Sequence, residues 1–399
     1  MRVVMENSEG RTMRVAVICA FDPNRNCGIY IVLKESQFFS QFPEIEPVFL
    51  TLGDADRLDS GDEALDREYR ELQSDPDFPA AYDAIYYWGD FLHARGYWSA
   101  DLIPRLLSHK VVGTRDEATE LIYKLVLLED QPDEILRRVV IFGGTTIADG
   151  VEAIEDQRYE KALTRLFSLC AAAKMRDAVS AFRIAQMTGK TATAGLDAAY
   201  LFTWANEWRG EPGAGKIGFY FGRSHRREKY LFVLLMLWLR VAKKWNVAWI
   251  QWFPAKRNET LFRMLSVRKH DARTWPVAEI VDDLTECEIC ITDVYHVCVN
   301  AWSAGIPAVC FGYGAKYDSD TVGSKKKEVM YLNMFAHRWY LFWENLSLTR
   351  LRQVSNLIVD LREHRERARQ VFQYQSAVSK RVHDELAAVT REMIAKSAQ

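Results

Sequence analysis

The stretch CEICITDVYHVCVNAWSAGIPAVCF, residues 287–311, carries the alternation that decides the fold. Its first part, Cys287–Thr292, is an apolar run of strand length, and His296–Ala304 has a helical pattern. Gly305 then ends the helix, and a second apolar run, Pro307–Phe311, follows at once. A strand, a helix and a strand in succession predict a βαβ unit with two parallel strands.

Short apolar runs alternate with helical patterns along most of the chain, which extends the same prediction to both halves. In the first half we expect strands at Val15–Ala20, Val48–Leu52, Ala84–Trp88, Val139–Phe142 and Cys170–Met175, with helices such as Ile29–Phe39 and Tyr159–Leu169. In the second half we expect strands at Lys216–Phe221, Ala248–Trp252, Cys287–Thr292 and Pro307–Phe311, and helices at Glu228–Ala242, Asn258–Leu265, Val277–Leu284 and His296–Ala304.

Turn-forming residues divide the chain into two lobes. The segment Glu211-Pro212-Gly213-Ala214-Gly215 interrupts the alternation, so we place the boundary there. The tail is almost entirely helical, with apolar residues at helical spacing (Leu351, Val354, Leu357, Ile358, Leu361). We predict a loose extension at residues 1–12, Rossmann-like domains at residues 13–210 and 216–346, and C-terminal helices at residues 347–399. This is an α/β fold of two Rossmann-like lobes with a C-terminal helical segment, similar to the GT-B architecture.

The composition is that of an ordinary globular protein, with 399 residues, 49% of them hydrophobic, and a formal net charge of -2. This charge balance argues against nucleic acid as a partner, because nucleic-acid-binding proteins usually carry a marked basic excess. The longest apolar helix pattern, Tyr230–Val241, is far shorter than the ~20 residues that span a bilayer. The first apolar run, Val15–Phe21, has strand length and is not a signal peptide. We expect a cytoplasmic protein with at most peripheral membrane contact.

The cysteines favour the same compartment. There are 7, an odd number, and most lie inside apolar runs, as buried reduced thiols do in the cytosol. Cys287-x-x-Cys290 has no second pair at zinc-ribbon spacing. We expect neither a metal nor a cofactor.

The chemistry is expected where strands meet helices, because ligands of open parallel sheets bind beyond the carboxyl ends of the strands. His296 follows a strand ending in Thr292-Asp293 and stands in the first turn of a helix, whose amides favour an anion. The alternative is structural, with Asp293 as a helix cap and His296 as a packed histidine. Arg176 opens another helix and suits a carboxylate or phosphate, unless it forms a surface ion pair with Asp177.

Basic residues mark two further segments. Gly222-Arg223-Ser224 follows a strand and opens a helix, so Arg223, Ser224 and the backbone amides could cradle an anion, although such turns are often simply solvated. Lys316 is our candidate for a further anion contact. The run Lys325-Lys326-Lys327 is interpreted as a solvated helix face.

The acceptor side of a site is expected after the strand that ends in Tyr87-Trp88. Asp90 and His93 follow it and could face a sugar. The rings of Tyr87 and Trp88 could stack on that sugar or lie in the core.

Together these junctions resemble the polysaccharide pyruvyltransferase family. The family's C-terminal signature is similar to Thr292-Asp293-Val294-Tyr295-His296 followed by Gly305-Ile306-Pro307, with Val294 in place of Ser and Tyr295 in place of Phe. The Arg of the family's other motif form is absent. The Arg-Asp-x-x-Ser motif with a downstream Asp is similar to Arg176-Asp177-Ala178-Val179-Ser180 and Asp197. The resemblance covers residues 14–345 and includes an early Asn26-x-Gly28 turn.

The resemblance implies phosphoenolpyruvate as donor and a pyruvate ketal on a polysaccharide or glycan precursor as product, as in exopolysaccharide biosynthesis. The acceptor would be a glycan or a lipid-linked sugar. The donor's CH2 group must gain a proton and the sugar hydroxyl must lose one, so His296, with an ordinary pKa near neutrality, is our general acid or base. Asp90 is assigned to catalysis at the acceptor. Substrate binding is assigned to Arg176, Arg223, Ser224, Lys316 and Asp293.

Two alternatives stay open, because a fold does not fix a function. A GT-B nucleotide-sugar glycosyltransferase would need a ribose-binding carboxylate late in the second lobe, for which Glu328 is a candidate. A non-catalytic glycan-binding relative would explain the missing Arg.

Overall fold

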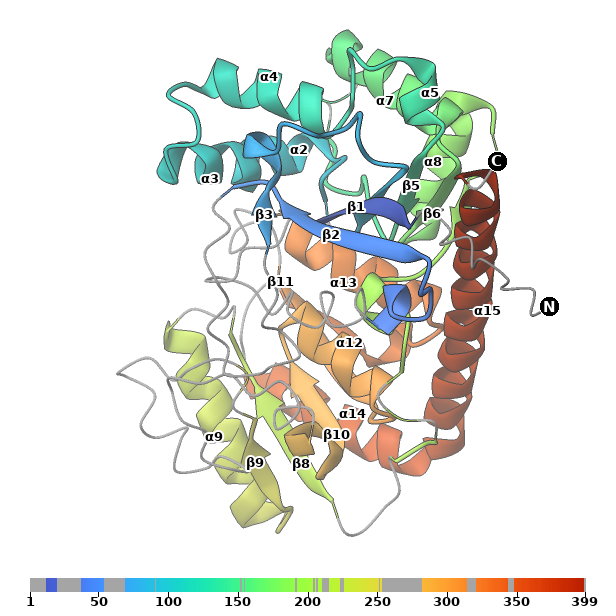
Figure 1. Ribbon diagram of the computed structural model, residues 1–399. Helices are drawn as coiled ribbons and strands as arrows, with labels where there is room; N and C mark the ends of the chain where they lie inside the picture. The colour runs from blue at the N-terminus through green and yellow to red at the C-terminus, as the bar shows by residue number, and fades with distance from the viewer. Residues whose placement is uncertain are drawn as a thin grey trace, which may run out of the picture.

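The computed structural model contains two parallel β-sheets, each packed against helices (Figure 1). The structure describes residues 12–19, 37–53, 69–89, 91–150, 153, 155–190, 192–203, 205, 207–209, 215–222, 226–250, 252, 282–313, 321–343 and 348–397.

The N-terminal sheet has seven strands in the order β3-β2-β1-β4-β5-β6-β7, and all its strand pairs are parallel. The strands are β1 (Met13–Cys19), β2 (Ile45–Thr51), β3 (Arg70–Glu71), β4 (Ala84–Trp88), β5 (Val139–Phe142), β6 (Ala172–Met175) and β7 (Thr193–Ala194). β4 lies between β1 and β5 with Tyr87 opposite Ile141, and all of its residues are buried. Burial on both faces explains why such strands are continuous apolar runs in the sequence.

One buried carboxylate, Asp149, ties three helices of the first lobe together. The described helices of this lobe are α2 (Arg95–Tyr97), η2 (Trp98–Leu102), α3 (Ile103–Ser108), α4 (Arg115–Leu125), α5 (Asp133–Leu136), α7 (Gln157–Leu169) and α8 (Ala178–Thr188), besides the short η1 (Leu72–Ser74) and η3 (Ala198–Tyr200). Asp149 accepts hydrogen bonds from the Gly96 amide at 3.2 Å and the Tyr159 hydroxyl at 2.8 Å, and it also pairs with Arg183 on α8. This carboxylate therefore fixes α2, α7 and α8 relative to one another.

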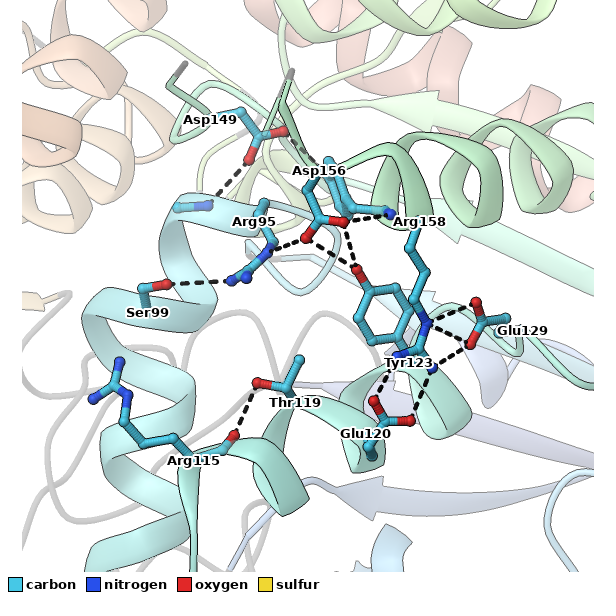
Figure 2. Close-up of polar contacts among 12 residues, drawn as sticks. Arg95, Ser99, Arg115, Thr119, Glu120, Tyr123, Glu129, Asp149, Asp156 and Arg158 are labelled. Carbon is cyan, nitrogen blue, oxygen red and sulfur yellow. Dashed lines mark hydrogen bonds and ion pairs between the residues drawn. The ribbon is translucent and has the colours of Figure 1, made fainter. Parts of the chain in front are cut away.

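A second polar network fastens α7 to α4 (Figure 2). Asp156 caps α7 by accepting from the Tyr159 amide at 3.0 Å, and it also accepts from the Tyr123 hydroxyl and from Arg95. Arg158 lies 3.9 Å above the Tyr123 ring and reaches Glu120 and Glu129. Exposed ion pairs of this kind contribute about 0–1 kcal/mol each, so the network mainly sets the geometry of the outer layer.

The C-terminal sheet has five parallel strands in the order β12-β11-β10-β8-β9. They are β8 (Lys216–Tyr220), β9 (Val247–Trp249), β10 (Cys287–Thr292), β11 (Ala308–Tyr313) and β12 (Tyr340–Trp343). The helices are α9 (Arg226–Ala242), α12 (Tyr295–Ser303), α13 (Thr321–Asn333) and the short η4 (His337–Trp339). Gly305 ends α12 with a φ of 77° and a hydrogen bond from the Ile306 amide back to the Ala301 carbonyl. The prediction that Gly305 closes this helix is confirmed.

Two helices end the described chain, α14 (Leu348–Glu363) and α15 (Arg365–Ser397). α15 runs beside both lobes (Figure 1). Its Ser379 donates to the carbonyls of Tyr200 and Leu201, and its Thr390 hydroxyl lies 2.9 Å from the Tyr86 hydroxyl of β4. Side chains of α15 share one buried apolar cluster with residues of both sheets. The lobes are therefore joined by a common core.

The structure confirms the predicted α/β architecture of two Rossmann-like lobes followed by helices. β4, β5 and β10 have the predicted bounds, whereas β3, β7 and β12 were not predicted. The expected helix Asn258–Leu265, most of Ile29–Phe39 and Val277–Leu284, the Asn26-x-Gly28 turn and the proposed boundary at residues 211–214 lie outside the described residues. Within the described ranges, none of the helices combines the length and the apolar character needed to cross a membrane.

Candidate active site between the lobes

Asp197 stands where the carboxyl ends of the two sheets face each other. Its carboxylate pairs with Arg176, which follows β6, at 3.3 Å, and accepts a hydrogen bond of 2.8 Å from the hydroxyl of Tyr295, the first residue of α12. It also accepts from the Ala199 amide at 3.0 Å. Arg176 is 8% exposed, and Asp197 and Tyr295 are each 4% exposed. A buried ion pair of the first lobe is thus hydrogen-bonded to a residue of the second.

The charges in this cluster are set by its partners. Burial by itself raises the pKa of the Asp197 carboxyl, but Arg176, then His296, the Ala199 amide and the Tyr295 hydroxyl together bring that pKa below its ordinary value. Burial, reinforced by Asp197, holds the pKa of the Tyr295 hydroxyl well above its ordinary value. Asp197 therefore stays ionised near neutrality, and Tyr295 stays a hydrogen-bond donor.

Two cations share a pair of aromatic rings next to Asp197. The Arg176 guanidinium carbon lies 4.6 Å from the centre of the Phe91 ring and 5.4 Å from that of Tyr295. The Lys326 ammonium lies 5.3 Å and 4.9 Å from the same two ring centres. A guanidinium and an ammonium side by side form a place where a carboxylate or phosphate binds well.

Lys326 was missed in the sequence, where residues 325–327 were interpreted as a solvated helix face. For Lys327 that interpretation is wrong. It is 3% exposed and donates to the carbonyl oxygens of Asp293 at 2.9 Å and Phe311 at 3.0 Å. Lys326 and Lys327 are adjacent in the sequence and differ in burial, and only the packing of α13 decides which one is buried. The predicted anion contact Lys316 lies outside the described residues.

His296 lies in the first turn of α12, next to Tyr295, with the two ring centres 5.2 Å apart. It is partly buried, and its electrostatic effect on Asp197 shows that it belongs to the same cluster as Arg176. The structure thus brings together two predicted site residues that are far apart in the sequence. Their roles in catalysis and binding stay predictions.

Asp293 is a buried residue that stabilises the structure next to the site. It is 0% exposed, and its carboxylate accepts a hydrogen bond of 2.8 Å from the Gly222 amide in the turn after β8. A Cβ on Gly222 would lie 3.1 Å from the Val294 side chain, so this turn packs closely against the start of α12. Asp293 therefore positions the turn, and α12 has Val294 at its N-cap instead. Arg223 and Ser224, which follow Gly222, lie outside the described residues.

The Asp and Ser of the Arg-Asp-x-x-Ser segment have structural contacts. Asp177 caps α8 by accepting from the Ser180 amide at 2.7 Å, and it also accepts from the hydroxyls of Thr145 at 2.6 Å and Ser180 at 2.9 Å. The Ser180 hydroxyl accepts from the Thr146 amide at 2.9 Å. The alternative of a surface Arg176–Asp177 pair is wrong, because both residues are buried and Arg176 pairs with Asp197.

Tyr87 and Trp88 of β4, and His93 after it, belong to the core and not to an acceptor site. Tyr87 and Trp88 are each 0% exposed and His93 is 1% exposed. The Tyr87 hydroxyl donates to the Leu125 carbonyl at 2.6 Å, and burial lowers the pKa of His93 to about 3. The alternative that Tyr87 and Trp88 lie in the core is therefore confirmed, and the expectation that His93 faces a sugar is wrong. Asp90 lies outside the described residues.

A cavity of about 380 Å³ opens beside the cluster. Arg176, Asp197, Tyr295 and Lys326 line its inner end, and residues of α13, of α15 and of the segment 194–197 are among those that line the rest. The Cys287 and Cys290 thiols lie elsewhere, in β10. Burial raises the pKa of Cys287 to about 12 and holds the pKa of Cys290 well above its ordinary value. Burial of this kind is typical of inert core thiols.

No family model and no curated protein matches the chain. Among solved structures it is similar to UDP-GlcNAc 2-epimerase from Neisseria meningitidis bound to UDP-GlcNAc, with 10% identity, a TM-score of 0.52, and 94% of this chain and 100% of that chain covered. It is also similar to S. aureus MnaA in a structure with UDP, with 10% identity, a TM-score of 0.50, and 93% and 94% covered. The chain therefore has a GT-B-like fold.

Proposed function

We propose that this chain is a cytoplasmic transferase of glycan biosynthesis that binds an anionic donor between its lobes and transfers part of it to a sugar. The observation that carries the proposal is the convergence of Arg176, Asp197, Tyr295 and His296 with Lys326 at the carboxyl ends of two sheets. The free, mostly buried cysteines of the described chain suit a reducing compartment.

We propose phosphoenolpyruvate as the donor and transfer of its pyruvate unit as the reaction. The residues on which the pyruvyltransferase resemblance depends, Arg176, Asp197 and Tyr295-His296, meet in one cluster although they are distant in sequence. Arg176 and Lys326 would hold the carboxylate and the phosphate of the donor. Asp197 fixes Arg176 and Tyr295 and so shapes the site without touching the donor.

The chemistry needs a proton donor and a proton acceptor but no cofactor. Protonation of the donor's CH2 group makes its C2 atom electrophilic, and a first sugar hydroxyl adds to C2 while losing its proton. A second hydroxyl of the sugar then adds to C2, loses its proton and displaces inorganic phosphate, which closes the ketal. His296 is the described residue suited to transfer these protons, because it lies in the cluster and its ordinary pKa is near neutrality.

A nucleotide sugar is the second candidate donor. The fold comparisons bear more directly on this class than on phosphoenolpyruvate, because the similar solved structures are of proteins bound to UDP-GlcNAc or UDP. The same cations would then hold the diphosphate. Glu328, the carboxylate considered for the ribose, is exposed on α13.

One experiment separates these donors. The protein is incubated with phosphoenolpyruvate, UDP-sugars or GDP-sugars, each together with a panel of free and lipid-linked glycans, and the release of phosphate and of nucleotide is measured. Acceptor-dependent phosphate release from phosphoenolpyruvate, with a ketal signal in the NMR spectrum of the product, is the expected result. Nucleotide release would establish the second candidate, and binding without turnover would identify a non-catalytic glycan-binding relative.

A further inference from the structure

The cavity beside Asp197 has two chemically different ends. Its inner end is the ionic cluster already described, and its outer end is formed by α13 and α15, with Asn333, Phe335, Tyr374 and Gln375 among the lining residues. Its volume of about 380 Å³ falls in the range of small-molecule sites. Arg176, Asp197, Tyr295 and Lys326 line the same cavity, so its outer end adjoins the proposed donor site.

An aromatic pair forms the rim of this outer end. Phe335 is 62% exposed and Tyr374 is 43% exposed, and their ring centres lie 5.3 Å apart in an edge-to-face arrangement. Large exposed rings lose the benefit of burial, so their presence at a cavity mouth points to a ligand that covers them. The apolar C–H face of a pyranose ring is such a ligand, because it stacks on aromatic faces while its hydroxyls stay available for hydrogen bonds.

Phe335 has a left-handed backbone conformation just after α13. Its φ is +58°, in the left-handed region, and it occupies the end of α13, where the amide of Phe335 bonds to the Leu332 carbonyl and the amide of Ala336 to the Tyr331 carbonyl. The same pair of bonds surrounds Gly305 at the end of α12. Glycine is the usual residue at this position because it has no Cβ. The same pair of bonds surrounds Lys110, after α3, so this chain also accommodates other residues at such a position.

Amide side chains complete the compartment. Gln375 is 8% exposed and lines the cavity. A side-chain amide in a cavity wall can form hydrogen bonds with a polar ligand that enters the cavity. Asn333, partly buried, lines the same cavity. Amides both donate and accept, as is required to bind sugar hydroxyls.

We propose that the outer compartment, formed by Asn333, Phe335, Tyr374 and Gln375, is a saccharide-binding site that holds one sugar unit of the acceptor glycan. This assignment rests on the proposed glycan transferase function and adds the place where the acceptor binds. The sugar stacks on the rings of Phe335 and Tyr374, and the two amides bind its hydroxyls.

The test is ligand-observed NMR with the full chain and the methyl glycosides of glucose, galactose, mannose and glucuronic acid as probes. Saturation transfer to at least one probe is expected for the wild type, with binding about tenfold weaker or more in Phe335→Gly and Gln375→Ala. Phe335→Gly should keep or raise the melting temperature, because glycine suits the left-handed backbone. Trp238→Ala is the control, since this exposed aromatic residue of α9 is not among the residues that line the cavity.

The proposal is overturned if no probe receives saturation, or if folded Phe335→Gly and Gln375→Ala bind the probe as the wild type does. Calorimetric titration of the same proteins with phosphoenolpyruvate and UDP separates this outcome from failure of the proposed function. Saccharide binding without any donor binding would disprove the transferase and leave the sugar site standing. If the protein binds and turns over a donor but Phe335→Gly and Gln375→Ala change nothing, the transferase function stands and the sugar site is disproved.

Discussion

Asp197 makes a polar contact between the lobes, since one carboxylate holds Arg176 and Tyr295. Asp197→Asn keeps the shape but leaves the buried Arg176 guanidinium without its counter-charge, so we expect a loss of about 3–5 kcal/mol in the free energy of unfolding. Tyr295→Phe removes one hydrogen bond to a charged group and should cost about 1.5–3 kcal/mol. Urea unfolding of the two variants measures both values. Equal, small losses would show that the ion pair does not matter for stability.

The same carboxylate predicts how stability depends on pH. The pKa of Asp197 is lower in the folded protein than its ordinary value of 3.8, so its contribution to stability is complete above that ordinary value and is lost as the pH falls through the folded-state pKa. The difference in melting temperature between the wild type and Asp197→Asn should therefore be constant near neutrality and shrink below a pH of about 4. Melting curves recorded across this range test the prediction. A difference that grows in acid would contradict it.

His296 offers the clearest catalytic test, because it is only partly buried and can be replaced with limited structural cost. We expect His296→Ala to lower kcat about 10²–10⁴-fold, the usual contribution of a general acid or base, with a melting temperature close to that of the wild type. Steady-state kinetics with the donor found to react, together with melting curves, provide the measurement. A folded variant with wild-type kcat would assign His296 a structural role. Arg176→Ala is a less direct test, because it combines loss of an anion contact with loss of a buried ion pair.

At the scale of single elements, α13 shows why some site residues cannot be read from the sequence. Buried parallel strands such as β4, β5 and β10 have continuous apolar runs, and their bounds could be predicted. The two-residue strands β3 and β7 carry no such pattern. The three adjacent lysines of α13 are chemically alike, so only the helix packing separates Lys326 at the cleft from the buried Lys327.

The neighbouring lysines of α13 should therefore respond differently to the same substitution. Lys326→Met removes a cation from the proposed donor site and should weaken donor binding by about 1.5–3 kcal/mol with little change in stability. Lys327→Met leaves the carbonyl oxygens of Asp293 and Phe311 without their donor and should lower the free energy of unfolding by about 1–3 kcal/mol. Calorimetric titration and urea unfolding of both variants measure the two effects. If the two variants behaved alike, the assignment of Lys326 to the site would fail.

Some residues of the predicted motifs have structural roles instead of site roles. The segment 176–180 was correctly predicted to open a helix, but Asp177 and Ser180 serve the fold, by capping α8 and binding the loop after β5. Hydrogen-bonded caps and polar site residues use the same amino acids, and the sequence does not distinguish them. The aromatic pair Tyr87-Trp88 is a second case. Both residues lie in a strand that is buried on both faces, so neither ring is free to stack on a sugar.

At the scale of the whole molecule, one apolar cluster extends from the N-terminal sheet through the C-terminal sheet to α15. Lobes that share a core cannot unfold independently without exposing part of it. We therefore expect a single transition in differential scanning calorimetry, with equal calorimetric and van't Hoff enthalpies. Two separated transitions would show that the lobes are independent units and that α15 does not couple them.

The position of α15 also has a consequence for biosynthesis. Tyr86 in β4 meets Thr390, which lies 304 positions later in the chain. The first sheet therefore leaves the ribosome long before the helix that covers part of it, and during translation this face has no partner. A nascent N-terminal lobe of this kind must be shielded from aggregation until the last helix is made, so its yield in the cell should depend on chaperones that bind exposed apolar surface.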